Sequence, residues 1–273
     1  SSYQLEYSRI FKSKYAAILN LSHDHIERHK NLNKYIKAKF KLLKNQCNKD
    51  LAFVNKDDLL INNELKSNNF KSKVIKISTK KDIRFLKNID NEYFLTESNK
   101  ENLSFVLAIS KKFHIKKNLL IKTIQKFKGL KYRQQIIFRR KYLTIINDSK
   151  STSFSSSISL LKENKKIFWL LGGIYKKGDK LELSKKYFKN IKAFIYGKDK
   201  KIFSKKLKDK IKYKNFNNLK DALKEIFVIV KKERPLNSTI LFSPCAASFD
   251  NFKNFEDRGL YFNKLVKMYE NEL

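Results

Sequence analysis

The sequence predicts an α/β fold with a mostly parallel sheet. Short apolar runs that fit buried strands alternate with longer segments of helical periodicity, which is the pattern of strands joined by crossover helices. A polar loop follows several of the apolar runs, as expected where an α/β protein binds its ligand. The alternation restarts after Gly129, so we place a domain boundary near residues 129–132 and expect domains at residues 1–130 and 131–273.

The first domain opens with a compact apolar run at residues 15–21, which fits a buried strand. The polar segment 22–29 follows it and should be the loop at that strand's C-terminal end. Further strands are predicted at residues 51–54, 74–77 and 93–95. Helical spacing is present at residues 33–45, 101–113 and 118–127. The last of these helices should stop at Gly129, because glycine favours the left-handed conformation that ends many helices.

The second domain alternates strands and helices more regularly. Strands are predicted at residues 136–138, 143–146, 167–171, 193–196 and 239–242. The intervening helices are predicted at residues 153–161, 183–188, 202–207, 219–230 and 252–269. Strands separated by helices in this way favour parallel pairing.

Composition restricts the class of protein. The 273 residues are 41% hydrophobic, which is enough for packed cores. No apolar run approaches the roughly 20 residues of a membrane span, so we expect no membrane insertion. The two cysteines, Cys47 and Cys245, lack any paired spacing, which argues against a disulfide scaffold and fits a reducing cytoplasm.

The formal net charge of +36 is the feature that most favours a nucleic-acid partner. Lysines are nevertheless scattered over every segment, and they are enriched together with Asn, Ile, Phe and Tyr, residues that AT-rich codons encode. We therefore expect a solvated basic surface and no specific nucleic-acid partner. A basic RNA- or DNA-binding protein stays the alternative from a different class, and it would require one continuous positive face.

The loop NDSKST, residues 147–152, carries the clearest chemistry. It follows the apolar run 142–146, so it should lie at a strand's C-terminal end and at the start of the next helix. Asp148 supplies an acceptor and Lys150 a cation two residues later, with the hydroxyls of Ser149, Ser151 and Thr152 beside them. Such a loop suits a phosphorylated substrate.

Several segments together resemble the Mur ligase family of ATP-dependent amino-acid ligases. The resemblance runs nearly from end to end, in the same order as in the family. The matching blocks are SSYQLE (1–6), LNLSHDHIERH (19–29), YIKAKFKLL (35–43), NKEN (99–102), GLKYRQQ (129–135), NDSKST (147–152), LLGG (170–173) and SPCAASFDNFKNFEDRG (243–259). The last block is most similar to the family member that adds D-glutamate.

The resemblance implies part of a P-loop-type ATPase central domain followed by a Rossmann-like C-terminal domain. It also implies a cytoplasmic enzyme of peptidoglycan precursor synthesis that uses ATP and Mg²⁺. ATP would phosphorylate the carboxylate of UDP-N-acetylmuramoyl-L-alanine, and the amine of D-glutamate would attack the acyl phosphate. Another amide ligase of the superfamily, such as a folylpolyglutamate synthase, is the nearer alternative, since it would keep the ATP chemistry and change the acceptor.

The resemblance also implies roles for residues around ATP. His25 and Lys39 would hold magnesium, with Lys39 converted to a carbamate whose oxygens suit a hard cation. Asn102, Arg133 and Asp148 would bind ATP: arginine can fork onto phosphate oxygens, and aspartate can accept from a ribose hydroxyl. Lys150 would be catalytic, neutralising charge on the transferred phosphoryl group.

By the same resemblance, Thr152, Lys176, Ser248 and Phe255 would hold D-glutamate. A dianionic amino acid needs a cation and hydroxyl donors, but Lys177 is adjacent to Lys176 and the sequence leaves that choice open. Phe255 also fits a packing stripe with Phe249 and Phe252, so its role stays open as well. Zinc is disfavoured at His25 and His29, because their HIERH segment matches no zinc-helix motif and no third ligand is near.

The chain departs from the family in one major respect. It contains no GxxxxGK[ST] motif, and the run GIYKKGD at residues 173–179 lacks the lysine and hydroxyl that must follow the second glycine. In the family that loop lies upstream of the segment resembling SSYQLE. We therefore expect this chain to be a fragment that cannot turn over by itself. Ser98 and Ser153 are smaller departures at single positions.

Overall fold

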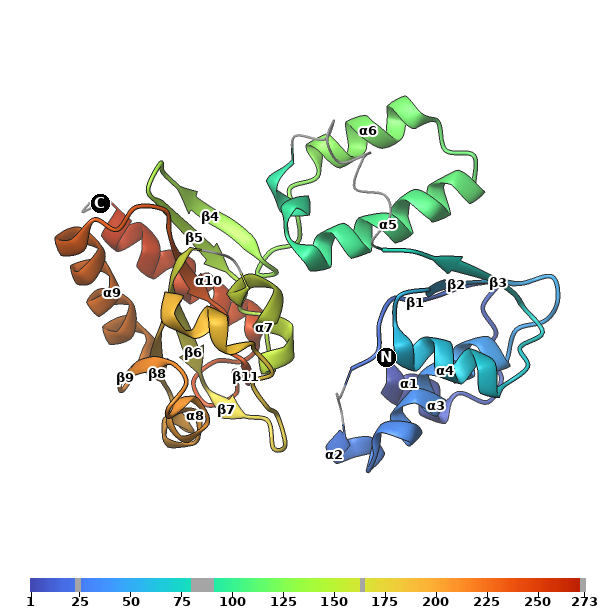
Figure 1. Cartoon of the computed structure of the whole chain (residues 1–273), viewed down its shortest axis with the longest axis horizontal. Helices are drawn as coiled ribbons and strands as arrows, with labels where there is room; N and C mark the ends of the chain where they lie inside the picture. Colours follow the sequence, from blue (N-terminus) through green and yellow to red (C-terminus); the bar gives the residue numbers. More distant parts are fainter. Residues whose placement is uncertain (23–25, 80–90, 163–164, 271–273) are drawn as a thin grey trace. The chain divides into compact units, whose positions relative to one another are not determined.

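A computed structural model describes residues 1–22, 26–79, 91–162 and 165–270 (Figure 1). The chain divides into two compact units, Ser1–Phe127 and Lys128–Leu273, and each is described by itself. The predicted boundary at residue 130 is close to this division. Within the described residues, no helix is both long and apolar enough to span a membrane.

The first unit contains a three-stranded parallel sheet in the order β1-β2-β3. Its strands are β1 (Tyr15–Ile18), β2 (Leu51–Asn55) and β3 (Lys73–Ile77). Helices α3 (Leu32–Lys44) and α4 (Leu59–Ser67) cover one face, where Phe40, Leu43 and Ile61 are fully buried. The polar side chain of Asp58 caps α4 by accepting from Ile61 N.

Helix α5 (Glu97–Lys112) covers the other face of this sheet, because Phe105 packs on Phe53 and Ile77. A smaller cluster joins α5 to α6 (Lys117–Lys126). The predicted strand at residues 93–95 is wrong: Glu92–Leu95 forms a 3₁₀ helix. Asn91 explains the difference, since its side chain caps Tyr93 N and also donates to Ile124 O.

Two short helices complete the first unit. They are α1 (Ser2–Tyr7) and α2 (Ile26–His29). Helix α1 begins with a capping box in which Ser1 and Gln4 bond reciprocally. The buried His29 lies beside Ser2, with Nε2 3.1 Å from its Oγ, and thereby links α2 to α1.

The second unit contains a six-stranded sheet in the order β4-β5-β10-β6-β8-β9. Every neighbouring pair is parallel except β4 with β5, so the predicted mostly parallel sheet is confirmed. The strands are β4 (Gln135–Arg139), β5 (Leu143–Asn147), β6 (Lys166–Gly172), β8 (Ile191–Tyr196), β9 (Lys212–Asn215) and β10 (Ser238–Phe242).

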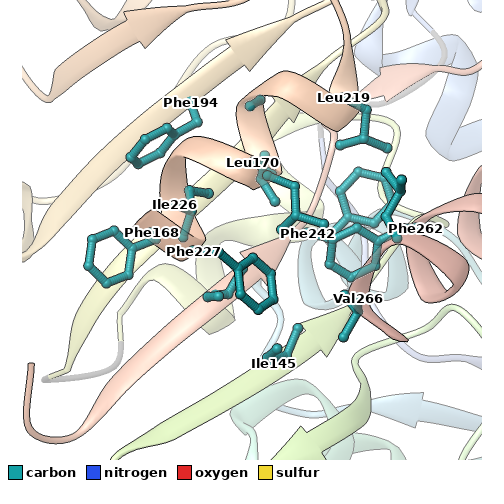
Figure 2. Packing of buried hydrophobic residues seen from close by; sticks show 14 of the residues in the cluster. Ile145, Phe168, Leu170, Phe194, Leu219, Ile226, Phe227, Phe242, Phe262 and Val266 are labelled. Atoms are coloured by element: carbon teal, nitrogen blue, oxygen red, sulfur yellow. The ribbon is translucent and has the colours of Figure 1, made fainter. Parts of the chain in front are cut away.

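Helices cover both faces of the large sheet. On one face, α9 (Leu219–Glu233) and α10 (Phe255–Tyr269) bury an aromatic-rich cluster, in which Phe242 stacks on Phe262 at 4.2 Å between ring centroids (Figure 2). On the other face, α7 (Phe154–Leu161) and α8 (Lys200–Leu207) pack around the fully buried Trp169. The result is a three-layer α/β arrangement of the Rossmann-like type.

Other elements of the second unit also differ from the prediction. Residues 183–188 were expected to form a helix, but the helical segment there is a 3₁₀ helix, Lys185–Asn190. A two-stranded antiparallel ribbon, β7 (Ile174–Tyr175) with β11 (Ala246–Ala247), was not predicted. This ribbon matters for the site because it ties together the loops that follow β6 and β10.

Candidate functional site

Three loops meet at the carboxyl edge of the large sheet. They follow β5, β10 and β6, which are adjacent strands with Phe242 opposite both Asn147 and Leu170. Backbone hydrogen bonds join them, from Asp148 N to Phe242 O at 2.7 Å and from Gly172 N to Pro244 O at 2.9 Å. Parallel order therefore brings together sequence segments that are about 100 residues apart, at the edge where such sheets bind ligands.

Asp148 is buried at the centre of this edge, with 5% of its surface exposed. Its Oδ2 accepts from Ser243 Oγ at 2.7 Å, and its Oδ1 accepts from Gln134 N at 3.1 Å. Burial raises the pKa of Asp148 from 3.8 to about 7, against the opposing effects of these two hydrogen bonds and of Arg133 and Arg258. A carboxylate oxygen can accept more than one hydrogen bond, so each still has acceptor capacity for a ligand hydroxyl.

The ammonium group of Lys150 lies over the ring of Phe255, with Nζ 3.7 Å from the ring centroid. Lys150 N donates to Tyr132 O at 3.0 Å, which fixes the loop to the segment that carries Arg133. Burial and the nearby charge of Arg133 lower the pKa of Lys150, while Glu256 raises it. The contact brings together two residues for which the family resemblance implies different ligands, and it puts the Phe255 ring beside the cation.

The charge of Arg133 acts on the pKa of both Asp148 and Lys150, so these three side chains belong to one group. Arg133 is exposed, Lys150 is partly exposed and Asp148 is buried. The chemistry of this group is two accessible cations beside one acceptor, which is suited to phosphate oxygens and a sugar hydroxyl.

Thr152 and the loop after β7 meet through Asp179. The Oδ2 of Asp179 accepts from Phe154 N at 2.6 Å at the start of α7, two residues beyond Thr152. The Asp179 backbone N donates to Lys176 O at 3.1 Å, and Tyr175 Oη donates to Asp179 O. Thr152 is exposed and Lys176 is partly buried, whereas the neighbouring Lys177 is exposed.

Ser248 lies directly after β11 and is 3% exposed. Its carbonyl accepts from Asn251 N and Phe252 N, which forms the turn that leads to α10. Phe255 begins α10 and is partly buried, Phe252 packs on Tyr261, and Phe249 is 71% exposed. The three phenylalanines therefore do not form the single packing stripe that was the other interpretation of Phe255.

A buried group of hydroxyls and one thiol, which was not predicted from the sequence, adjoins Asp148 through Ser243. Ser157 Oγ is 2.5 Å from Ser243 Oγ and 2.9 Å from Cys245 Sγ, and Ser151 Oγ is 2.9 Å from Ser157 Oγ. Burial raises the pKa of the Cys245 thiol. The serine-rich run at residues 151–157 was the available signal, but its partners Ser243 and Cys245 lie about 90 residues away in the loop after β10.

The candidates in the first unit are less well defined. Lys39 is partly buried on α3, with Nζ 4.9 Å from the Tyr35 ring centroid, and Asn102 is exposed on α5. His25 lies outside the described residues, so its expected proximity to Lys39 stays a prediction. The described residues include no group of three or more His, Cys, Asp or Glu that could hold a metal ion.

Comparisons with known proteins agree on one family. Residues 1–123 match the Mur ligase middle domain. The chain is 31% identical to a UDP-N-acetylmuramoylalanine–D-glutamate ligase of Rickettsia bellii over 97% of the chain and 63% of that protein. It is 33% identical to the enzyme of the same name from Francisella philomiragia, with the same coverage. The chain thus spans about 63% of the length of these curated relatives.

Solved structures support the fold. MurF from Acinetobacter baumannii superposes with a TM-score of 0.65 at 15% identity, covering 94% of this chain and 60% of that one. MurF from Thermotoga maritima, solved in complex with ADP, gives 0.63 at 14% identity over 99% of this chain and 64% of that one. A bifunctional folylpolyglutamate synthase/dihydrofolate synthase from Yersinia pestis gives 0.58 at 10% identity over 93% and 62%. At these identities the similarity establishes the architecture alone.

Proposed function

We propose that this chain, which belongs to the Mur ligase family, is part of an ATP-dependent ligase that adds D-glutamate to UDP-N-acetylmuramoyl-L-alanine. Its relatives of that name match nearly the whole chain at 31% and 33% identity. The enzyme would act in the cytoplasm, in the synthesis of a peptidoglycan precursor. The observation that carries the proposal is the meeting of Asp148, Lys150 and Phe255 at one sheet edge with the loops of Thr152, Lys176 and Ser248.

D-glutamate fits the chemistry of these loops. It carries two carboxylates, which need cations and hydroxyl donors, and the loops offer Lys176 together with Thr152 and Ser248. Phe255 covers the hydrocarbon part of the ligand in this proposal and keeps Lys150 in place through its ring. Lys176 is the better candidate of the lysine pair because it is partly buried, and a partly buried cation attracts a carboxylate more strongly than an exposed cation such as Lys177.

ATP is the second substrate in this proposal. Arg133 would bind phosphate oxygens and Asp148 would accept from the ribose, and Asn102 is a further ATP ligand that the family resemblance implies. Lys150 would stabilise the phosphoryl group as it moves to the muramoyl-alanine carboxylate and ADP leaves. The neutral amine of D-glutamate then attacks the acyl phosphate, loses a proton, and expels phosphate from a tetrahedral intermediate.

Magnesium enters the proposal only as the ion that accompanies ATP. His25 and a carbamate on Lys39 are its proposed ligands. No step of the reaction is assigned to them.

Isothermal calorimetry of the chain with D-glutamate tests the proposal. We expect saturable binding of D-glutamate and at least tenfold weaker binding of L-glutamate, because the pocket must fix the stereocentre for attack. Lys176→Met should weaken D-glutamate binding, whereas Lys177→Met, its matched control, should leave it within about twofold. Equal binding of both enantiomers, or equal effects of the two substitutions, would contradict the proposed site.

The two alternative functions predict different binding results for this chain. A folylpolyglutamate synthase-like ligase would keep ATP binding and accept a folyl substrate in place of the muramoyl one. A nucleic-acid-binding protein would show an affinity that falls steeply with salt and depends on sequence or structure. Weak, uniform binding to polyanions is what a solvated lysine-rich surface predicts.

A further inference from the structure

Arg258 is a fully buried cation next to the candidate site. It lies in the first turn of α10 and is 1% exposed. Burial lowers the pKa of its guanidinium. A buried charge is costly unless hydrogen bonds satisfy it, so its partners indicate what it does.

The guanidinium binds two of the three loops at once. Its Nε donates to Ser149 Oγ at 3.1 Å, and its Nη2 donates to Ser149 O at 2.7 Å and to Ala246 O at 3.0 Å. Ser149 Oγ in turn donates to Phe255 O at 2.8 Å, so the hydroxyl connects the arginine, the loop and the start of α10. These acceptors are two carbonyls and a hydroxyl, which fix the position of the Arg258 guanidinium but carry no negative charge to neutralise it.

The two loops held in this way carry the candidate ligand-binding side chains. Ser149 lies between Asp148 and Lys150, and Ala246 precedes Ser248 by two residues. Beside Arg258, Gly173 lets the two strands of the β7–β11 ribbon approach closely, since a Cβ there would meet Ala247 O at 2.6 Å. The guanidinium therefore holds the two loops through separate hydrogen bonds.

We propose that Arg258 is a positioning residue that fixes the loop of Asp148 and Lys150 relative to the loop of Ser248. If the function proposed above holds, it sets the distance between the phosphoryl-binding cation and the D-glutamate site without touching either substrate. Lysine cannot replace it, because only the planar fork reaches Ser149 and Ala246 together.

Amide hydrogen exchange of the 273-residue chain provides the test. The amides of Asp148, Lys150 and Ser151 all donate to backbone carbonyls, so they start protected. Arg258→Lys and Arg258→Met should each accelerate exchange at residues 148–151 and 246–248 by about tenfold or more, with β6 and β8 amides changed less than about twofold. Acceleration that is uniform over the sheet, or restored protection in Arg258→Lys, would overturn the proposal.

Two further variants separate positioning from general stability. Ser149→Ala removes one acceptor and should loosen residues 148–151 while 246–248 keep their protection; equal loosening of both would overturn the proposal. Arg140→Lys, at an exposed arginine of the same unit, is the matched control and should change neither loop.

Binding of D-glutamate gives a separate readout. Arg258→Lys should weaken it by about tenfold, in parallel with the loop exchange. If the unsubstituted chain binds no D-glutamate, the proposed function fails while the exchange result still decides the role of Arg258. Loosened loops with unchanged D-glutamate affinity would contradict positioning of this site.

Discussion

Replacing Asp148 with asparagine should make the second unit more stable at neutral pH and flatten its pH dependence. The rise in the Asp148 pKa from 3.8 to about 7 corresponds to about 4 kcal/mol between the two protonation states. Between these values the folded carboxyl holds a proton that the unfolded chain has lost, so the free energy of unfolding falls as pH rises from about 4 to about 7. The loss of stability caused by ionising the buried Asp148 is complete above about pH 7 and absent below about pH 4.

Asparagine preserves the local geometry. Its oxygen can accept from Gln134 N, and its amide can donate to Ser243 Oγ, whose hydroxyl rotates to suit. At pH 8 we therefore expect Asp148→Asn to raise the free energy of unfolding by up to about 4 kcal/mol, and at pH 4 to change it by less than about 1 kcal/mol.

The only tryptophan of the chain makes the assay specific. Trp169 is fully buried in β6, and its Nε1 donates to Ser243 O at 2.9 Å, so its fluorescence in urea reports unfolding of the second unit. The free energy of unfolding from these urea curves, plotted against pH from 4 to 8, should diverge between Asp148→Asn and the unsubstituted chain. Asp221→Asn, at an exposed carboxylate of the same unit, should follow the unsubstituted chain. Parallel curves, or a less stable Asp148→Asn at pH 8, would refute the reasoning.

Other predictions follow from single contacts. Gly259→Ala places a Cβ 2.4 Å from Tyr132 Cδ1, so the clash should cost about 1–3 kcal/mol and exceed the roughly 1 kcal/mol gained in helix propensity. Trp169 fluorescence in urea measures this change in stability, and a more stable variant would contradict the packing of Gly259 on Tyr132. Thiol labelling should modify the partly exposed Cys47 in the native chain and the buried Cys245 only after denaturation, because burial raises the Cys245 pKa; equal native rates would contradict this burial. Phe255→Leu should weaken D-glutamate binding by removing the ring beneath Lys150, as calorimetry would show, and unchanged affinity would assign Phe255 to packing alone.

Periodicity predicted most of the fold because the main elements carry strong local patterns. The strands β2, β6, β8 and β10 consist mainly of apolar residues and are mostly buried, as expected for strands covered on both faces. The misses have local causes. The edge strand β9 reads KYKN and is exposed throughout, so it gives no apolar signal. Helix α4 carries only one buried residue, Ile61, and its start depends on the cap from Asp58.

Residue chemistry alone could predict the candidate site only where its residues share a loop, and its other proposed members came from the family resemblance. Asp148 and Lys150 are two residues apart, so their loop was recognisable from the sequence. Arg258 and Ser243 act on that loop from about 100 residues away, and only strand order brings them to it. A buried arginine in a chain with 62 basic residues gives no compositional signal.

Mapping D-glutamate on the chain by amide chemical shifts tests the account most directly. The account predicts that D-glutamate shifts the amides of Thr152, Lys176, Ser248 and Phe255 together, since their loops meet at the carboxyl edge of one sheet. L-glutamate at the same concentration should shift them much less. Shifts confined to other segments, or identical maps for the two enantiomers, would contradict the assignment of this edge as the D-glutamate site.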